Sequence, residues 1–102
     1  MKKTLAIIVP VYNEADSINE FDQLLRSTLA PLPDLIRHIV YVNDGSTDAS
    51  YKLLTKLARD HNDTTVLCLS RNFGKEIATT AGILETDADA LLTLDADGQH
   101  PV

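Results

Sequence analysis

Four runs of apolar residues, rich in β-branched side chains, recur along the chain and predict four β-strands. The runs cover residues 5–11, 36–43, 65–69 and 90–94. The first run is almost continuously apolar, which is typical of a central parallel strand covered on both faces. The last run leads directly into Asp95-Ala-Asp97, and indicates a buried strand with two carboxylates at its carboxyl end.

Between these runs, apolar residues recur at helical spacing and predict three helices. Asn13 or Asp16 is expected to cap the first helix. Ser46 or Thr47 is expected to cap the second. The apolar stripes consist of Ile18, Phe21, Leu24, Leu25 and Leu29 in the first helix, Leu53, Leu54, Leu57 and Ala58 in the second, and Ile77, Ala78, Ala81 and Leu84 in the third.

The order of the elements, βαβαβαβ, predicts an α/β fold with a parallel sheet and right-handed crossovers. In such sheets, ligands bind at the carboxyl ends of the strands, where the strand order reverses. If the strand order is 3-2-1-4, this point lies between the first and fourth strands. Residues 12–14 would then lie beside residues 95–97, with Asp44 one strand away at the same edge.

Composition and charge narrow the class of protein. The 102 residues are enough for one small domain, and the net charge of -6 argues against nucleic acid as a partner. No apolar run reaches the length of a membrane-spanning helix, and Pro10 interrupts the first run too early for a signal peptide. The sequence therefore predicts a soluble, cytoplasmic domain, with the lone Cys68 as a small core residue.

The pair Asp95 and Asp97 is the sharpest candidate for chemistry in the sequence. Mg²⁺ and Mn²⁺ prefer oxygen ligands, often carboxylates shared with substrate phosphates. A divalent cation would also relieve the repulsion between the two carboxylates. Asp-x-Asp is nevertheless common in turns, and His100 is more simply interpreted as an exposed loop histidine than as a metal ligand.

Polar residues at two further strand ends could bind a nucleotide. Tyr12 offers a flat face for a base or sugar, and Glu14 offers an acceptor for hydroxyl groups, but the same segment could equally be a helix start. Asp44 could accept a hydrogen bond from a base N–H group, although Asp-Gly-Ser is also ordinary turn chemistry.

The end of the third strand carries two cations. Arg71 and Lys75 flank Phe73-Gly74 where phosphates would lie, although a loop with solvated charges is the alternative. The chain lacks G-x-G-x-x-G after the first strand and lacks G-x-x-x-x-G-K-[ST], which disfavours Rossmann dehydrogenases and P-loop NTPases. Because all these positions share one sheet edge, a nucleotide-type ligand is favoured over coincidence.

Residues 8–14 (Ile-Val-Pro-Val-Tyr-Asn-Glu), 42–48 (Val-Asn-Asp-Gly-Ser-Thr-Asp) and 95–97 (Asp-Ala-Asp) resemble the inverting glycosyltransferases of family 2. Residues 70–76 and 95–101 resemble the branch that transfers a sugar from UDP- or GDP-sugar to polyprenyl or dolichyl phosphate. The resemblance implies a Rossmann-like, three-layer α/β/α fold with a four-stranded parallel sheet in the order 3-2-1-4, which is the N-terminal half of the GT-A fold.

The resemblance also implies a nucleotide-sugar site. The first strand end would line the base and ribose pocket, the second would hold the base, and Asp95 and Ala96 would border the ribose and phosphates. The implied nucleotide-sugar-binding residues are Pro10, Tyr12, Glu14, Val42, Asp44, Lys75, Asp95, Ala96 and Asp97.

A divalent metal, Mg²⁺ or Mn²⁺, is implied at the same site. Asp97, with Asp95 and Gln99, resembles the position that binds this metal on the diphosphate. The physical reason is that the metal neutralises charge that develops on the departing nucleoside diphosphate. Arg71 and Lys75 would anchor the loop or the phosphates.

Enzymes of this branch continue beyond Asp-x-Asp into an acceptor-binding half, so residues 1–102 are expected to be the donor-binding half and to be inactive alone. The catalytic residues are expected elsewhere, in a parent protein at the cytoplasmic face of the membrane. The alternatives are an inactive nucleotide-sugar-binding fragment and an interaction module. The strand at 90–94 would be an unguarded edge, which favours a homo-oligomer.

Overall fold

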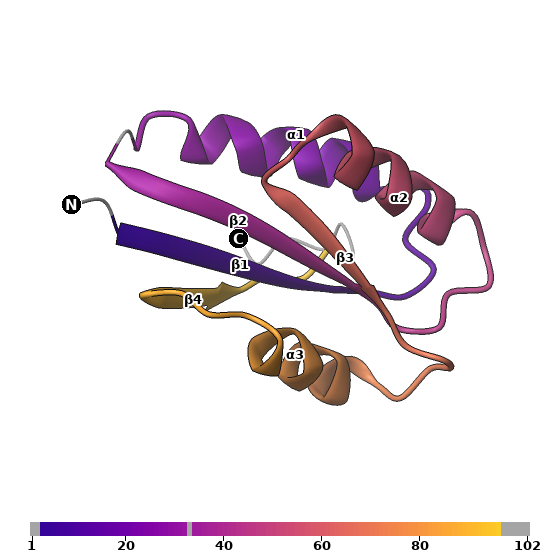
Figure 1. The fold of residues 1–102 in the computed structure, drawn as a ribbon. Helices are drawn as coiled ribbons and strands as arrows, with labels where there is room; N and C mark the ends of the chain where they lie inside the picture. The colour runs from indigo at the N-terminus through magenta and orange to yellow at the C-terminus, as the bar shows by residue number, and fades with distance from the viewer. Residues whose placement is uncertain (1–2, 33, 97–102) are drawn as a thin grey trace.

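The computed structural model describes residues 3–32 and 34–96, which form seven elements in the predicted order (Figure 1). Each predicted strand boundary lies within two residues of the observed one, so the apolar runs located the strands correctly. The strands are β1 (Lys3–Val11), β2 (Leu35–Asn43), β3 (Thr64–Cys68) and β4 (Ala90–Thr93), and the helices are α1 (Ile18–Leu29), α2 (Ser50–Asp60) and α3 (Lys75–Leu84).

The four strands are parallel and follow the order β3-β2-β1-β4, which confirms the predicted fold class and strand order. Strand β1 pairs with β2 from Lys3–Leu35 to Val11–Asn43 and with β4 from Leu5–Ala90 to Ile8–Thr93. Helices α1 and α2 cover one face of the sheet and α3 covers the other, which gives three layers (Figure 1). The carboxyl ends of all four strands therefore lie at one edge.

Alternate residues of β1 enter two separate cores, one on each face of the sheet. Ile7 and Val9 are fully buried in the larger core, together with Leu25 of α1 and Leu54 of α2. Ile8 is fully buried in the smaller core, which it shares with residues of β2 and α3. The prediction of a central strand covered on both faces is therefore confirmed.

Strand β4 is the edge strand beside β1, and all four of its residues are exposed. The prediction that this run is buried is wrong for this chain, because β4 pairs on one side only and Leu91 and Leu92 remain 44% and 43% exposed. The prediction of an exposed edge at this position is confirmed. Burial resumes only beyond the strand, at Ala96, which is 1% exposed.

The lone cysteine is not a core residue. Cys68 is exposed, because it is the last residue of β3, the edge strand at the opposite side of the sheet. An apolar run on an edge strand has only one strand neighbour, so its end is easily left uncovered. The thiol is 3.9 Å from Nδ2 of Asn43 on the neighbouring strand.

None of the four residues expected to cap α1 and α2 does so. Helix α1 begins after Ser17 and α2 begins after Ala49, and neither residue makes a side-chain capping hydrogen bond. The expected caps fail because Asn13, Ser46 and Thr47 hydrogen-bond to one another across two loops instead.

Candidate functional site

A cleft of about 230 Å³ opens at the carboxyl ends of β1 and β2. Most of its lining residues were predicted from the sequence as site residues, and they come from the end of β1, the end of β2 and the start of α3. The ring of Tyr12 is 44% exposed, so a ligand can reach its face. The lining residues are Pro10, Val11, Tyr12, Glu14, Asp44, Asn72 and Lys75.

The loop after β1 is fastened to the loop after β2 by reciprocal hydrogen bonds. The Asn13 N–H donates to Ser46 Oγ at 3.0 Å, and the Thr47 N–H donates to Asn13 Oδ1 at 2.8 Å. Asn13 adopts φ 51°, a left-handed conformation that asparagine tolerates better than most residues. This conformation lets its backbone and side chain face the same loop, and fixes Tyr12 and Glu14 on either side of it.

The backbone beyond Asn13 is held in the same way. The Glu14 N–H donates to Ser50 Oγ at 2.8 Å, and the Ala15 N–H donates to Asp48 Oδ2 at 3.2 Å. Desolvation alone would raise the pKa of Asp48, but hydrogen bonds from Ser50 and Ala15 outweigh it and lower that pKa below its ordinary value. Asp48 is therefore an ionised anchor that helps to hold Glu14 beside the cleft.

Asp44 is the buried carboxylate of the cleft, at 2% exposure. Its Oδ1 accepts a hydrogen bond from the Phe73 N–H at 2.8 Å. Its Oδ2 accepts from the Gly74 N–H at 3.0 Å and from Asn72 Nδ2 at 3.1 Å. The side chain therefore holds the loop between β3 and α3, in addition to lining the cleft.

Lys75 and Asp95 form an ion pair, with 2.9 Å between Nζ and Oδ2. Lys75 is the first residue of α3 and lines the cleft, whereas Asp95 follows β4. The pair therefore brings the end of β4 to the cleft, as the strand order predicts. Both side chains are substantially exposed, at 61% and 48%, so the pair is a weak surface interaction that a ligand can replace at little cost.

The metal prediction rests on three residues, of which the structure describes one. Asp97 and Gln99 lie outside the described residues. Within residues 3–32 and 34–96, no group of three or more His, Cys, Asp or Glu side chains could hold a metal ion. Asp95 fits one ligand position of Mg²⁺ or Mn²⁺, because its carboxylate is a hard oxygen donor that already attracts a cation, the Lys75 ammonium.

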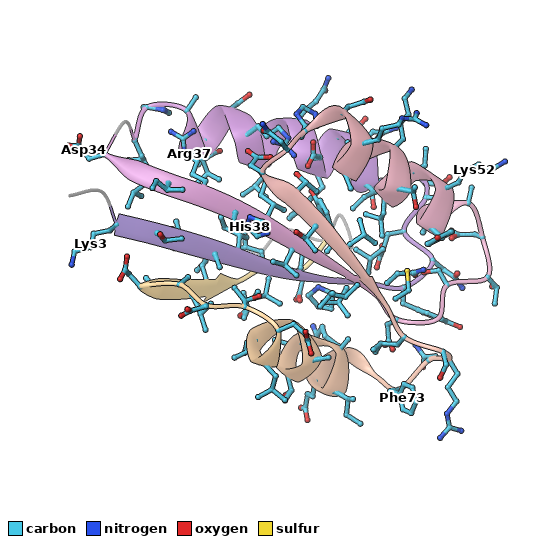
Figure 2. The ribbon with its side chains drawn as sticks, in the orientation of Figure 1. Lys3, Asp34, Arg37, His38, Lys52 and Phe73 are labelled. Atoms are coloured by element: carbon cyan, nitrogen blue, oxygen red, sulfur yellow. The ribbon has the colours of Figure 1, made fainter. Side chains whose placement is uncertain are left out.

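Four of the predicted residues that the structure describes do not line this cleft, although Asp95 is joined to it by its ion pair with Lys75. Val42 is fully buried in the core under α3, and Ala96 is buried in the core on the other face of the sheet. Arg71 lies over the Phe73 ring, 4.7 Å from the ring centroid. Figure 2 shows Phe73 in the loop that leads to α3. Val42 and Ala96 are therefore core residues, and Arg71 is engaged within its own loop.

Sequence reasoning missed Val11 and Asn72 as lining residues. Val11 was counted as strand core, and its core role is observed as well. Asn72 carries a signal that could have been used, since an amide side chain directly before Phe-Gly at a helix start is well placed to bind a neighbouring loop. Its Nδ2 donates to both the carbonyl and the carboxylate of Asp44.

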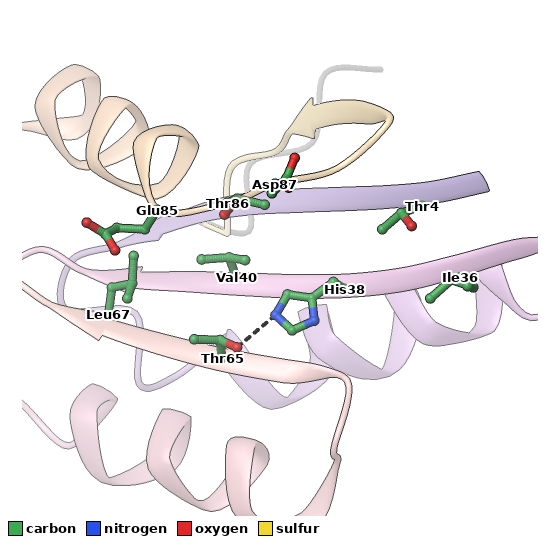
Figure 3. A pocket seen from close by; sticks show the side chains of 9 residues that line it. All are labelled: Thr4, Ile36, His38, Val40, Thr65, Leu67, Glu85, Thr86 and Asp87. Carbon is green, nitrogen blue, oxygen red and sulfur yellow. Dashed lines mark hydrogen bonds between the residues drawn. The ribbon is translucent and has the colours of Figure 1, made fainter. Parts of the chain in front are cut away.

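A second cavity of about 230 Å³ lies between the end of α3 and the first halves of β1, β2 and β3 (Figure 3). His38 contacts Thr65 Oγ1 at 2.7 Å along its floor, and Glu85 and Asp87 lie at its rim. None of the predicted site residues lines it. This cavity is therefore separate from the cleft at the carboxyl ends of the strands.

The fold and the cleft define a parallel α/β protein with a cleft at the carboxyl edge of its sheet. The model of the family described as Glycosyl transferase family 2 matches residues 6–102. The chain therefore belongs to glycosyltransferase family 2, as the motifs at its strand ends predicted.

Individual relatives agree with this assignment. The undecaprenyl-phosphate 4-deoxy-4-formamido-L-arabinose transferase of Klebsiella pneumoniae is 40% identical over 102 residues, which is 97% of this chain and 30% of that protein. The structure of the mannosyltransferase PcManGT from Pyrobaculum calidifontis, in complex with GDP-Man and Mn²⁺, superposes with a TM-score of 0.81 at 26% identity. It covers 100% of this chain and 30% of that one.

A third comparison adds a different donor. The structure of S. aureus TarS 1-349 in complex with UDP-GlcNAc superposes with a TM-score of 0.73 at 25% identity, covering 95% of this chain and 27% of that one. The chain thus spans about 30% of the length of the curated relatives it matches. Among the described residues, the helices are too short and too polar to cross a membrane.

Proposed function

We propose that these 102 residues form the donor-binding half of an inverting glycosyltransferase that transfers a sugar from UDP- or GDP-sugar to a polyprenyl-phosphate-type lipid. The observation that carries this proposal is the cleft lined by Tyr12, Glu14, Asp44 and Lys75 in a family 2 chain, with Asp95 joined to it by the Lys75–Asp95 ion pair. The lipid acceptor is supported by the relative that is named as an undecaprenyl-phosphate transferase. Such an acceptor would place the parent protein at the cytoplasmic face of a membrane.

The nucleoside is proposed to lie against β1 and β2. The exposed Tyr12 ring provides a face for stacking on the base or sugar, and Glu14 provides an acceptor for ribose hydroxyls. The four acceptor sites of the Asp44 carboxylate are not exhausted by the three donors it receives, so one remains for a base N–H. Pro10, which also lines the cleft, would complete the wall behind the base.

The diphosphate is proposed to lie between Lys75 and Asp95. Among the described residues of this region, Glu14, Asp44 and Asp95 are acidic and Lys75 is the cation that pairs with Asp95. A diphosphate adds further negative charge, so a divalent cation is needed to offset the repulsion. Asp95, Asp97 and Gln99 would hold Mg²⁺ or Mn²⁺, which when bound would neutralise the departing nucleoside diphosphate.

Calorimetry on the 102-residue chain measures which nucleotide binds, UDP or GDP, and which metal this binding needs, Mn²⁺ or Mg²⁺. We expect UDP or GDP to bind with Mn²⁺ or Mg²⁺ present and to bind much more weakly in EDTA. Asp97→Ala should remove this metal dependence, whereas Asp34→Asn, at the opposite end of β2, should not. Equal nucleotide affinity with and without metal in the wild-type chain would refute the metal site.

A second role, as an interaction module, is favoured by one observation. Strand β4 exposes all of its residues along the edge of the sheet, and such edges pair readily with other chains. The two roles differ in one measurement: a nucleotide-binding half should bind UDP or GDP with metal whether or not it self-associates, whereas an interaction module should self-associate and bind neither nucleotide.

A further inference from the structure

We propose that Asp44 is a positioning residue, whose buried carboxylate fixes the start of α3 and thereby holds the Lys75 ammonium at the mouth of the cleft against Asp95. This inference rests on the proposed function, since it assigns a task to Lys75 in binding the diphosphate. It differs from the expected role of Asp44, which is to read the base directly.

The first observation is the number of donors that converge on this carboxylate. Two consecutive backbone N–H groups, of Phe73 and Gly74, and the amide of Asn72 donate to its two oxygens at 2.8 to 3.1 Å. Hydrogen bonds to an ionised carboxylate are stronger than those between neutral groups. The Asp44 side chain is 2% exposed, so its oxygens are sheltered from competing water, although the Asn72 donor belongs to an exposed residue.

The second observation is that Asp44 is itself rigidly held. Its N–H donates to the Val11 carbonyl at 2.8 Å, which continues the β1–β2 pairing one residue beyond β2. The next residue, Gly45, adopts φ 70° and leaves no room for a side chain, because a Cβ atom there would overlap the backbone of Arg71 and Asn72. The loop before α3 is therefore packed directly on the end of the sheet.

The third observation is the short path from this loop to the cleft. Gly74 is the residue before the first turn of α3, and Lys75 follows it directly. Gly74 adopts φ 102°, a conformation far from that of the helix and one of several that glycine enters freely, so a contact is needed to select it. The hydrogen bond from the Gly74 N–H to Asp44 supplies such a contact, and it sets the direction in which Lys75 leaves the backbone.

The two possible roles of Asp44 predict different effects on different ligands, which can be measured. A residue that reads only the base acts on ligands that have a base, whereas a residue that positions Lys75 acts on any diphosphate. Inorganic pyrophosphate with Mn²⁺ is therefore the diagnostic probe, since it has a diphosphate and no base. UDP and GDP with Mn²⁺ provide the comparison.

The test is a double-mutant cycle with Asp44→Asn and Lys75→Met, measured by calorimetry with Mn²⁺ and pyrophosphate. Asp44→Asn should lower pyrophosphate affinity by about ten-fold, because one accepting oxygen is replaced by a donor that opposes the loop N–H groups. In the Lys75→Met background the same change should cost less than about two-fold, because the two residues act through one another. Asp34→Asn, the same chemical change at the far end of β2, should have no effect.

Amide hydrogen exchange tests, without any ligand, whether the Asp44 carboxylate fixes the loop before α3. Phe73 and Gly74 N–H groups should exchange faster in Asp44→Asn than in the wild-type chain, while the β1–β2 amides keep their protection. If Asp44→Asn does not fold, Asn72→Ala is the substitute, because it removes one donor to Asp44 at an exposed residue. It should give a smaller increase in amide exchange at Phe73 and Gly74.

Two results would overturn the inference. Unchanged exchange at Phe73 and Gly74 in Asp44→Asn would show that the carboxylate does not fix the loop. Unchanged pyrophosphate affinity, with weaker UDP or GDP binding, would show that Asp44 reads the base alone. A wild-type chain that binds neither nucleotide nor pyrophosphate refutes the proposed function and the diphosphate task of Lys75. The exchange result alone then tests whether the Asp44 carboxylate fixes the loop before α3.

Discussion

The side-chain oxygen of Asn13 accepts a hydrogen bond from the Thr47 N–H at 2.8 Å, and so joins the loops that follow the two central strands. The same oxygen is 3.3 Å from the Asp48 N–H. With Ser46, whose hydroxyl oxygen accepts from the Asn13 N–H at 3.0 Å, three residues of the motif at 42–48 therefore hold the motif at 8–14 in place. Tyr12 and Glu14, which flank Asn13, both line the cleft.

Replacing Asn13 separates the contribution of its hydrogen bonds to stability from the contribution of its left-handed backbone conformation. Asn13→Ala should lower the free energy of unfolding by about 1 to 3 kcal/mol, since it removes the hydrogen bonds and forces alanine into a left-handed conformation. Asn13→Gly removes the same hydrogen bonds without the backbone strain and should cost less. Urea denaturation of both variants measures the difference, and equal losses would show that the strain at φ 51° contributes nothing.

The two glycines beside the loop before α3 should respond differently to the same substitution. Both have positive φ, at 70° for Gly45 and 102° for Gly74, but only Gly45 has backbone atoms of Arg71 and Asn72 in the space that a Cβ would fill. Gly74→Ala should therefore cost about 1 to 3 kcal/mol from its conformation alone, because φ 102° with ψ 154° is a region that only glycine enters easily. Gly45→Ala should cost more and should increase amide exchange at residues 71–74. A smaller loss for Gly45→Ala than for Gly74→Ala would contradict the close packing.

The sequence predicted the strands well because buried parallel strands are apolar over their whole length. It predicted the caps poorly because Asn, Ser and Thr can bind either their own helix or a neighbouring loop, and the sequence does not record which partner is near. For Asn13 and Ser46, the partner lies 33 residues away.

The candidate site was predictable to the extent that strand ends define it. The topology alone brings Tyr12, Asp44 and Asp95 to one edge of the sheet. The double role of Asp44 was not predictable, because its donors are backbone N–H groups whose positions depend on how the loop before α3 folds. The exposure of Cys68 was missed for a similar reason, since an apolar run does not reveal whether its strand lies at an edge.

Asp22 is a buried carboxylate outside the site, and the stability of the chain should depend on the Tyr41 hydroxyl that donates to it. The Tyr41 hydroxyl donates to Asp22, which is 2% exposed and also accepts from Arg26 at 2.8 Å. Burial, together with the bond to Asp22, raises the pKa of Tyr41 above its ordinary value. Tyr41→Phe leaves one oxygen of a buried carboxylate without this donor and should cost about 1 to 3 kcal/mol in urea denaturation. Tyr51→Phe, at a 53% exposed position, is the matched control and should cost almost nothing.

Acid should weaken the ion pair between Arg26 and Asp63, whose Nη1 and Oδ1 atoms are 2.9 Å apart. Desolvation raises the pKa of Asp63, but hydrogen bonds from Arg26 and Thr64 outweigh it, so the pKa lies below its ordinary value of 3.8. The folded state therefore favours the ionised form. This stability is complete above pH 3.8 and is lost as the pH falls through the lower, folded pKa.

The test of this pH dependence compares the wild-type chain with Asp63→Asn. The variant should be less stable near pH 6, and the difference should shrink below pH 3.8 as Asp63 is protonated in the wild-type chain. Asp60→Asn, at an exposed neighbouring position, should not reproduce this pattern. Urea denaturation between pH 3 and pH 7 measures both, and a constant difference across this range would contradict the role of the ion pair.

The edge strand β4 should drive self-association of the chain. Its residues Ala90–Thr93 are all exposed, and the strand carries no lysine or proline that would discourage pairing. Leu91 and Leu92 present apolar surface at 44% and 43% exposure. The opposing effect is the net charge of -6, which favours separate chains at low ionic strength.

Light scattering over a range of protein and salt concentrations measures the balance between these effects. We expect the apparent mass to rise with protein concentration, and to rise further with salt because salt screens the repulsion between chains. Leu92→Lys should return the chain to a monomer, since it places a charge on the edge strand. Leu24→Lys, at a 56% exposed position of α1, changes charge equally and should leave association unchanged. A wild-type chain that stays monomeric at high protein and salt concentration would show that charge repulsion is not what keeps β4 unpaired, and would exclude this edge as an interface between copies.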